Sequence, residues 1–273
     1  MHPRTYVLIT VGTALLAAAA VPITVLPALA QSTDEPPPAA PVPRAERRGV
    51  PGPPAGNPAA GPPPPARRPP AGGGPATEGG PVTAEALLSK VSHCQQISNG
   101  LYRTRESSST AVPVCDANGA VFWKADMDID CDGQVTDRCN LKTDPYFQSA
   151  TAYTESSGRA LNAKELPYIV VPTPSAIWNY RSSGIRGGSV AAVIHGDRVQ
   201  YAVVGDTGPP GIIGEGSLAT ARGLGISTDP YGGGIGEGVT YIIFKHSEVA
   251  SLEDQDSAAL QGEELARQFL LEN

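Results

Sequence analysis

Residues 190–217 have the sequence VAAVIHGDRVQYAVVGDTGPPGIIGEGS, and this stretch decides the expected fold. Two apolar runs, Val190 to His195 and Val199 to Val204, lie on either side of a Gly-Asp pair. Valine-rich runs joined by such a pair are typical of a β-hairpin. The second run leads into glycine-rich turns, where a ligand can approach the backbone closely. The stretch therefore predicts a hairpin that ends in turns suited to a binding site.

Three further runs, Ala120 to Trp123, Tyr168 to Val171 and Val239 to Phe244, have the same β-rich composition. Each is bounded by Gly, Pro, Asp or Asn, which punctuate strands. Strands at this density indicate a small barrel or a sandwich. We expect a mainly β fold, a small β-barrel with a few peripheral helices, and take the double-psi barrel as an analogy only.

Helix signals lie around these strands. Thr83 and Ser217 precede good helix formers and are expected to be N-caps. Gly223 and Gly225 would end the second helix. The acidic tail predicts a third helix over Glu263 to Leu271, with a packing role.

The chain of 273 residues divides into three parts by composition. Residues 1–30 combine a basic lead, an apolar run and an Ala-Leu-Ala site, which predicts a cleaved secretory signal peptide. The alternative is an uncleaved membrane anchor. Residues 31–81 are mostly Pro, Ala and Gly and are expected to be a disordered linker. Residues 82–273 are long enough for one catalytic domain with its own core.

The formal net charge of −7 hides a division along the chain. Residues 1–80 carry six arginines and four acids, so the remainder is more acidic than the total suggests. An acidic domain repels nucleic acid and favours a cationic partner.

Four cysteines lie within 46 residues of one another, at Cys94, Cys115, Cys131 and Cys139. An even number in an exported protein predicts two disulfides, although sequence does not separate the three possible pairings. We expect Cys94 to pair with Cys115, and Cys131 with Cys139. A zinc site is the alternative, but the spacing contains no C-x-x-C.

Asp206 and Glu215 are nine positions apart in the glycine-rich turns. Two carboxylates at a strand end suit general acid and base catalysis at a glycosidic bond. The plainer interpretation is that Asp206 only caps its turn.

A second acidic group has a carboxylate at every alternate position. Asp128 to Gly133 resembles the first half of a calcium loop, but the twelfth position is Cys139 instead of a glutamate. An extended segment would place the four carboxylates on one face. Such a face must meet solvent, a cation or a cationic ligand. The four residues are Asp126, Asp128, Asp130 and Asp132.

The remaining candidates for chemistry are few. We expect His195 and His246 to have structural roles. Trp123, Trp178 and the tyrosines can stack on sugar rings, with core packing as the default.

Several blocks, taken as an ordered set, resemble the secreted chitosanases of glycoside hydrolase family 75. They are ADMDIDCDG at 125–133, LPYIVVP at 166–172, VAAVI at 190–194, VVGDT at 203–207, GEGS at 214–217 and VTYIIF at 239–244.

The resemblance implies a secreted endo-chitosanase that hydrolyses β-1,4 linkages between glucosamine units with inversion. It implies Asp206 and Glu215 as the catalytic pair, and makes the acidic face a binding surface for chitosan, a polycation. We assign Glu215 as the acid and Asp206 as the base, although a nearby helix N-terminus would favour ionised Glu215. Glu237, in a second Gly-Glu-Gly, is a further substrate-binding candidate.

No metal, organic cofactor, nucleic acid or membrane partner is implied, and we expect a monomer. Two other functions compete with the chitosanase. One is a non-catalytic wall-polysaccharide-binding module of the double-psi type, and the other is a calcium-stabilised adhesion domain built on the acidic face.

Overall fold

The computed structural model describes residues 82–109 and 112–273. The expected signal peptide and linker, residues 1–81, lie outside the described residues. The elements, in chain order, are α1 (Ala84–Lys90), β1 (Gln95–Gln96), β2 (Cys115–Ala117), β3 (Ala120–Asp130), β4 (Tyr168–Pro172), the 3-10 helix η1 (Tyr180–Ser183), β5 (Val190–His195), β6 (Arg198–Gly208), β7 (Glu215–Ser217), α2 (Leu218–Leu224), β8 (Ile235–Phe244) and α3 (Gln255–Glu272).

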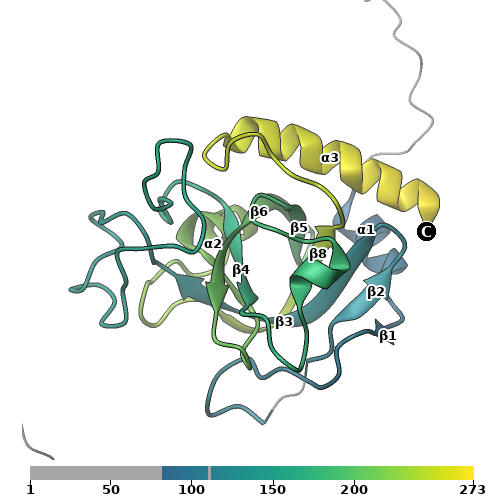
Figure 1. Cartoon of the computed structure of the whole chain (residues 1–273), viewed down its shortest axis with the longest axis horizontal. Helices are drawn as coiled ribbons and strands as arrows, with labels where there is room; N and C mark the ends of the chain where they lie inside the picture. The colour runs from purple at the N-terminus through teal and green to yellow at the C-terminus, as the bar shows by residue number, and fades with distance from the viewer. Residues whose placement is uncertain (1–81, 110–111) are drawn as a thin grey trace, which may run out of the picture. The chain divides into compact units, whose positions relative to one another are not determined.

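Six of these strands close into a barrel. The order around it is β3, β7, β4, β6, β5 and β8, and β8 pairs back with β3. Figure 1 shows these strands curving around a common centre, while β1 and β2 extend the sheet beyond β3. Closure removes the exposed strand edges that an open sheet would present. The expectation of a small mainly β barrel is confirmed.

The hairpin predicted from sequence is present. β5 and β6 pair from Val190 opposite Val203 to His195 opposite Arg198, with Gly196 and Asp197 as the turn. Gly196 has φ of 60°, a conformation that glycine adopts without a Cβ clash. β6 continues to Gly208 and therefore includes Asp206, which sequence placed on a turn.

The barrel wall has apolar side chains on both faces. Along β3, Val121 and Trp123 belong to one buried cluster, and Ala120 and Phe122 to the other, as the period of two in a strand requires. The ring of Trp123 stacks on Tyr241 with centroids 5.3 Å apart. Trp123 and Trp178 are both buried, so their expected core role is confirmed.

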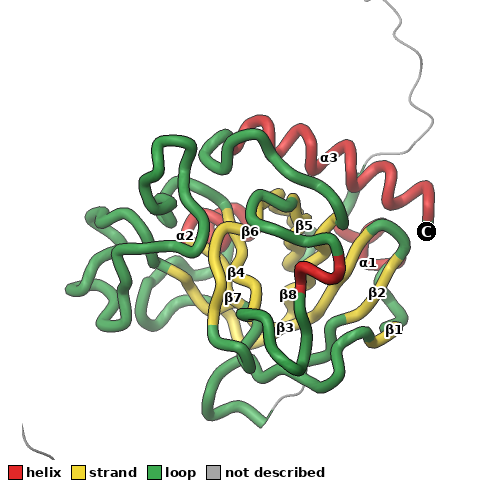
Figure 2. Tube along the Cα trace, viewed as in Figure 1, coloured by secondary structure: helices red, strands yellow, loops and turns green. Residues whose placement is uncertain are grey.

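The helices lie around the barrel (Figure 2). Thr83 and Ser217 cap α1 and α2 as expected, and Gly225 ends α2 with φ of 70°. The C-terminal helix α3 packs against β5 and β6, and its Phe269 contacts Phe244 edge-on at 6.2 Å. The helix is longer than the predicted 263–271 segment because Asp254 caps it at an earlier position.

Two disulfides join Cys94 to Cys115 and Cys131 to Cys139, which is the expected pairing. The second lies just beyond the end of β3 and closes a short loop next to the acidic residues. In the described part of the chain, every helix falls short of the length and apolar character needed to cross a bilayer.

Candidate active site

Strand pairing brings the predicted carboxylates into one row. Glu215 on β7 lies opposite Asp128 on β3 and, on its other side, opposite Val170 on β4. Asp206 on β6 lies opposite the same Val170. Directly paired residues project from the same face of a sheet. Asp128, Glu215 and Asp206 therefore stand side by side on three strands, with Val170 between the last two.

This row lines an open cavity of about 500 Å³. We call it the acidic cavity. The described residues that line it include no basic side chain. They are Asp128, Ile129, Asp130, Cys131, Asp132, Asp144, Tyr146, Gln148, Val170, Asp206, Thr207, Gly208, Pro209 and Glu215.

Asp206 is held rigidly at the edge of this cavity. A register shift in the β4–β6 pairing leaves Gly205 as an extra residue, because Ile169 lies opposite Val204 and Val170 opposite Asp206. Such a bulge redirects the next side chain. The Oδ1 atom of Asp206 then accepts hydrogen bonds from the backbone N–H groups of Thr207 and Ala152, both at 2.7 Å. The carboxylate is buried, with 7% of its residue surface exposed.

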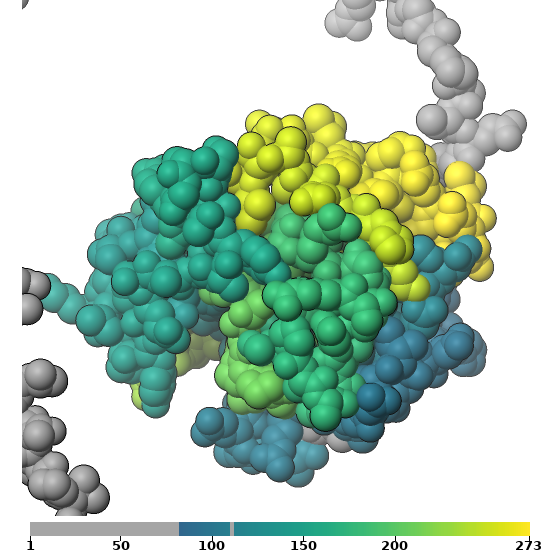
Figure 3. Space-filling model, in the orientation of Figure 1, coloured from purple at the N-terminus to yellow at the C-terminus, as the bar shows by residue number. Residues whose placement is uncertain are grey.

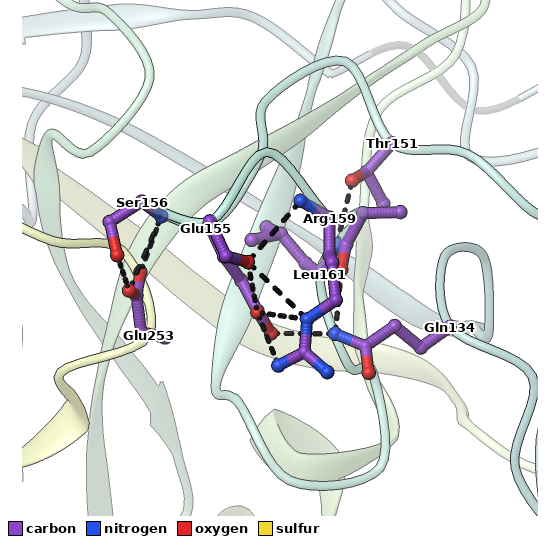
Figure 4. A network of polar contacts seen from close by, with 9 residues as sticks. Gln134, Thr151, Glu155, Ser156, Arg159, Leu161 and Glu253 are labelled. Atoms are coloured by element: carbon purple, nitrogen blue, oxygen red, sulfur yellow. Dashed lines mark hydrogen bonds and ion pairs between the residues drawn. The ribbon is translucent and has the colours of Figure 1, made fainter. Parts of the chain in front are cut away.

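The loop that supplies Ala152 is fastened by a polar network (Figure 4). Glu155 accepts from Arg159 Nη2 at 2.8 Å and from Gln134 Nε2 at 2.6 Å. Leu161 N–H donates to Thr151 Oγ1 at 3.0 Å, next to Ala152. These bonds join the loop to the segment after β3. They hold the Ala152 N–H group at Asp206.

Glu215 is half-buried and lies close to other carboxylates. A Cβ built on Gly208 would lie 3.0 Å from Glu215 Oε2, so the carboxyl group lies against the backbone of β6. Burial, followed by the neighbouring charges of Asp128 and Asp126, raises the pKa of Glu215 from 4.5 to about 7. Burial also raises the pKa of Asp206, but its two backbone N–H donors oppose the change. The two groups thus differ in proton affinity.

Asp130 and Asp132 complete the acidic cavity. One carboxylate oxygen from each, together with one from Asp206, form a group within 4.8 Å of one another. Burial, reinforced by the neighbouring carboxylates, raises the pKa of Asp130 well above its usual value. Burial also raises the pKa of Asp132 to about 6, although a hydrogen bond from the Gln148 N–H group opposes this change. Of the described residues, these three carboxylates are the set spaced to hold a cation.

Asp126 departs from the expectation that all four acids share one exposed face. It is 1% exposed and lines neither the acidic cavity nor the adjoining cavity that contains Arg105 and Tyr231. The pairing register between β3 and β8 shifts between Ala125 and Met127. The turn before β7 also packs directly on Asp126, because a Cβ built on Gly214 would lie 2.2 Å from Asp126 Oδ1. Its Oδ2 accepts from Arg105 Nη2 at 3.2 Å. Asp126 therefore does not share the exposed face expected for the four acids, and its role in binding substrate stays a prediction.

A second cavity of about 550 Å³ adjoins the first. Asp128, Ile129, Asp144 and Tyr146 line both, and the second adds Arg105 and residues 230–236, including Tyr231. We call it the tyrosine cavity. The segment 131–167, teal in Figure 3, supplies part of both walls. Glu237, the third acidic candidate, is exposed on β8 and lines neither cavity.

The sequence analysis named the tyrosines only as a group and did not single out Asp144, Tyr146 or Tyr231, which line these cavities. A signal for them exists, because the tetrapeptide Thr-Asp-Pro-Tyr occurs twice, at 143–146 and at 228–231. Residues of both copies line the tyrosine cavity.

Comparisons of the sequence with known proteins identify a family. A family model described as fungal chitosanase of glycosyl hydrolase group 75 matches residues 127–269. The chain is 35% identical to Endo-chitosanase C of Aspergillus oryzae over 133 residues. This aligned length is 47% of this chain and 32% of that protein. Endo-chitosanase C from a strain of the same species is 34% identical over 137 residues, 47% of this chain and 33% of that protein. The chain thus spans about a third of the length of these curated relatives.

The barrel, the acidic cavity and these matches define a protein of the glycoside hydrolase class. Within it, the chain belongs to the chitosanase family of glycosyl hydrolase group 75.

Proposed function

We propose that the protein is an endo-chitosanase that hydrolyses β-1,4 linkages between glucosamine units by an inverting mechanism. The observation that carries the proposal is the pairing register that sets Glu215 and Asp206 on either side of Val170. Neighbouring strands lie about 4.8 Å apart, so two strands separated by a third have backbones about 10 Å apart. Inverting enzymes need a comparably wide gap, about 6.5–9.5 Å between carboxyl groups, because a water molecule must enter.

In this mechanism Glu215 is the general acid. A pKa of about 7 keeps its carboxyl group protonated in mildly acidic solution. It donates this proton to the glycosidic oxygen as the bond to C1 breaks. Glu215 lies in β7, ahead of the Ser217 cap of α2, and its burial and acidic neighbours favour the protonated form that this role requires.

Asp206 is the general base. Its ionised form is stabilised by the N–H groups of Ala152 and Thr207. It takes a proton from the water that attacks C1 on the face opposite the leaving group, and the new reducing end has inverted configuration. Asp206 lines the acidic cavity, and both of these hydrogen bonds go to Oδ1, so we assign Oδ2 as the atom that accepts this proton.

The substrate is chosen by charge. Chitosan carries ammonium groups in mildly acidic solution, and the acidic cavity offers Asp128, Asp130 and Asp132 with no basic residue among its described lining. Ammonium groups near Asp130 and Asp132 would also lower the cost of ionising carboxylates held so close together. Glu237 remains a candidate for contact with more distant units of the polymer.

The rest of the proposal concerns the whole chain. Residues 1–30 direct secretion and are removed, residues 31–81 are a spacer, and residues 82–273 act as a monomeric catalytic domain. Neither nucleic acid nor a membrane is a partner after cleavage, and the reaction needs no organic cofactor.

Product analysis tests the proposal. Nuclear magnetic resonance of a glucosamine hexamer digest is expected to show internal cleavage with the α-anomer formed first. An initial β-anomer would contradict inversion. Binding without cleavage would support the wall-binding module instead. Loss of folding on removal of calcium, with no cleavage of chitosan, would support the adhesion domain, since the Asp130, Asp132 and Asp206 oxygens have a spacing that suits calcium.

A further inference from the structure

The two Thr-Asp-Pro-Tyr segments form turns of the same kind. In the first, Asp144 Oδ1 accepts from Tyr146 N–H at 2.9 Å, and in the second, Asp229 Oδ1 accepts from Tyr231 N–H at 3.1 Å. An aspartate that binds the N–H group two residues on, with proline between, gives a stiff turn. Each turn therefore presents a tyrosine in a fixed place.

Both turns are anchored to the site. Asp144 is buried and lines both cavities, and its carbonyl accepts from Phe147 N–H. Gly234, three residues after the second segment, lies against β3, because a Cβ there would come 2.2 Å from the Met127 carbonyl oxygen. Arg138, which precedes the first segment, donates from Nη2 to the Thr228 carbonyl of the second at 2.9 Å. The tyrosines are thus positioned before any ligand arrives.

The rings themselves are open to solvent. Tyr146 is 78% exposed and Tyr231 is 68% exposed. They are the aromatic members of the exposed large hydrophobic residues in the described part of the chain, and both line the groove. Aromatic rings are more often buried for their apolar area. Exposed rings gathered at a groove mark a surface that a ligand covers.

We propose that Tyr146 and Tyr231 are substrate-binding residues that stack on successive sugar rings of a glucosamine polymer in the tyrosine cavity. This inference rests on the proposed function and deepens it. A β-1,4-linked sugar ring has equatorial polar groups and an apolar C–H face, which matches the face of a phenol ring. Continuity supports a polymer as the occupant, since Asp128, Ile129 and Asp144 line both cavities.

The two cavities then bind one chain by different forces. The acidic cavity attracts ammonium groups, and this attraction weakens in salt. In the tyrosine cavity, Arg105 lies 3.2 Å from Asp126 and 3.5 Å from Asp128, and so offsets part of the negative charge. Stacking is apolar contact and persists in salt. Salt therefore separates the two contributions.

Binding of a glucosamine hexamer is measured by calorimetry in the Glu215→Gln background, where cleavage is blocked, at low salt and at about 1 M salt, where the Debye length is about 3 Å. Tyr146→Ala and Tyr231→Ala are each expected to weaken binding about tenfold at both salt concentrations. Tyr146→Phe and Tyr231→Phe keep the stacking face and should stay within about twofold. Leu260→Ala, at an exposed position on α3, is the matched surface control.

A second measurement does not depend on the alanine variants folding. Fluorine-labelled tyrosine in the Glu215→Gln chain, where cleavage is blocked, gives one resonance for each ring. Tyr146→Phe, Tyr231→Phe and Tyr241→Phe assign the three that are compared. The Tyr146 and Tyr231 resonances should shift on addition of hexamer, while that of buried Tyr241 should not.

Two results would overturn the inference while leaving the chitosanase intact. The first is hexamer binding that the alanine variants do not change, with no shift of the two resonances. The second is an alanine effect that disappears at high salt, which would make the contribution electrostatic. If the unmodified protein neither cleaves nor binds the hexamer, the proposed function itself fails.

Discussion

The acidic cavity and the tyrosine cavity adjoin each other but are built in different ways. The first is made by barrel strands, whose register sets Asp128, Glu215 and Asp206 in a row. The second owes its aromatic surface to two loop turns with the same four-residue sequence. Strands place charged groups with the accuracy that proton transfer needs. Short turns suffice for a flat apolar contact.

The two cavities also differ in their effect on stability. Burial raises the pKa of Asp130, Asp132 and Glu215, so ionising these groups opposes folding. The two tyrosines sit on turns that satisfy their backbone N–H groups. The acidic cavity is therefore the part whose ionised side chains lower the stability of the fold, as is common for catalytic sites.

The largest expected effect comes from Glu215. Glu215→Gln keeps the shape of the side chain but removes its proton, and we expect kcat on chitosan to fall about 10³-fold, or about 4 kcal/mol in the barrier. Steady-state kinetics on a substrate with the natural sugar leaving group measures this loss. A variant with more than a tenth of the activity would contradict the assignment.

Asp206→Asn separates the two roles within the acidic cavity. We expect a loss of kcat of similar size, about 10²-fold to 10⁴-fold, because the base can no longer take the proton of water. Azide can enter the space left for water and restore cleavage to this variant. Rescue of Glu215 variants alone would reverse the roles of the two residues.

Asp128 connects the two cavities and tests whether charge or catalysis dominates there. Asp128→Ala is expected to raise KM about tenfold at low salt and less at high salt, with a smaller fall in kcat. Since the Asp128 charge raises the pKa of Glu215, its removal should also move the alkaline limb of the kcat profile to lower pH. An unfolded variant would show that Asp128 is structural.

The loop that supplies Ala152 offers a smaller effect. Glu155→Gln removes the charged acceptor of Arg159 and loosens the loop that positions the Ala152 N–H group. We expect kcat to fall about threefold to tenfold with little change in KM, because geometry at Asp206 is disturbed but binding is not. Ser156→Ala is the matched control, because it removes the hydroxyl contact with Glu253 on the outer side of the same loop and keeps the Ser156 backbone N–H bond to that carboxylate.

The smallest effect is on stability. The pKa of Glu215 is higher in the folded protein than the usual 4.5, so the folded state binds more protons. Its contribution is fully present below about pH 4.5 and is lost as the pH rises to about 7. The thermal midpoint should therefore fall over this range. Glu215→Gln should raise it by a few degrees at pH 8 and leave it nearly unchanged at pH 4, as measured by calorimetry.

Much of the fold follows from local sequence. The hairpin at 190–204, the caps at Thr83 and Ser217, and the strand segments at 120–123 and 239–244 all have clear apolar patterns or turn residues. The structure extends these strands to Gly208, Asp130 and Ile235, beyond the predicted segments. By contrast β7 is three residues long and glycine-containing, so it has no strand pattern of its own. It is a strand only because β3 and β4 hydrogen-bond to it on both sides.

The candidate site divides in the same way. Sequence picked out Asp206, Glu215 and the three acids Asp128, Asp130 and Asp132, since carboxylates on turns and alternating acids are visible in one dimension. Sequence did not show that Asp126 is buried, because a register shift against β8 and the close approach of Gly214 are tertiary events.

Sequence by itself determined a mainly β chain, an acidic domain, the identities of the carboxylates and the residues that cap the helices. These depend on residue type and on neighbours close along the chain. Only the tertiary structure decided which carboxylates face one another, which is buried and how strongly each holds its proton. Those properties depend on strand register and solvent exclusion, which arise when segments far apart in sequence pack together.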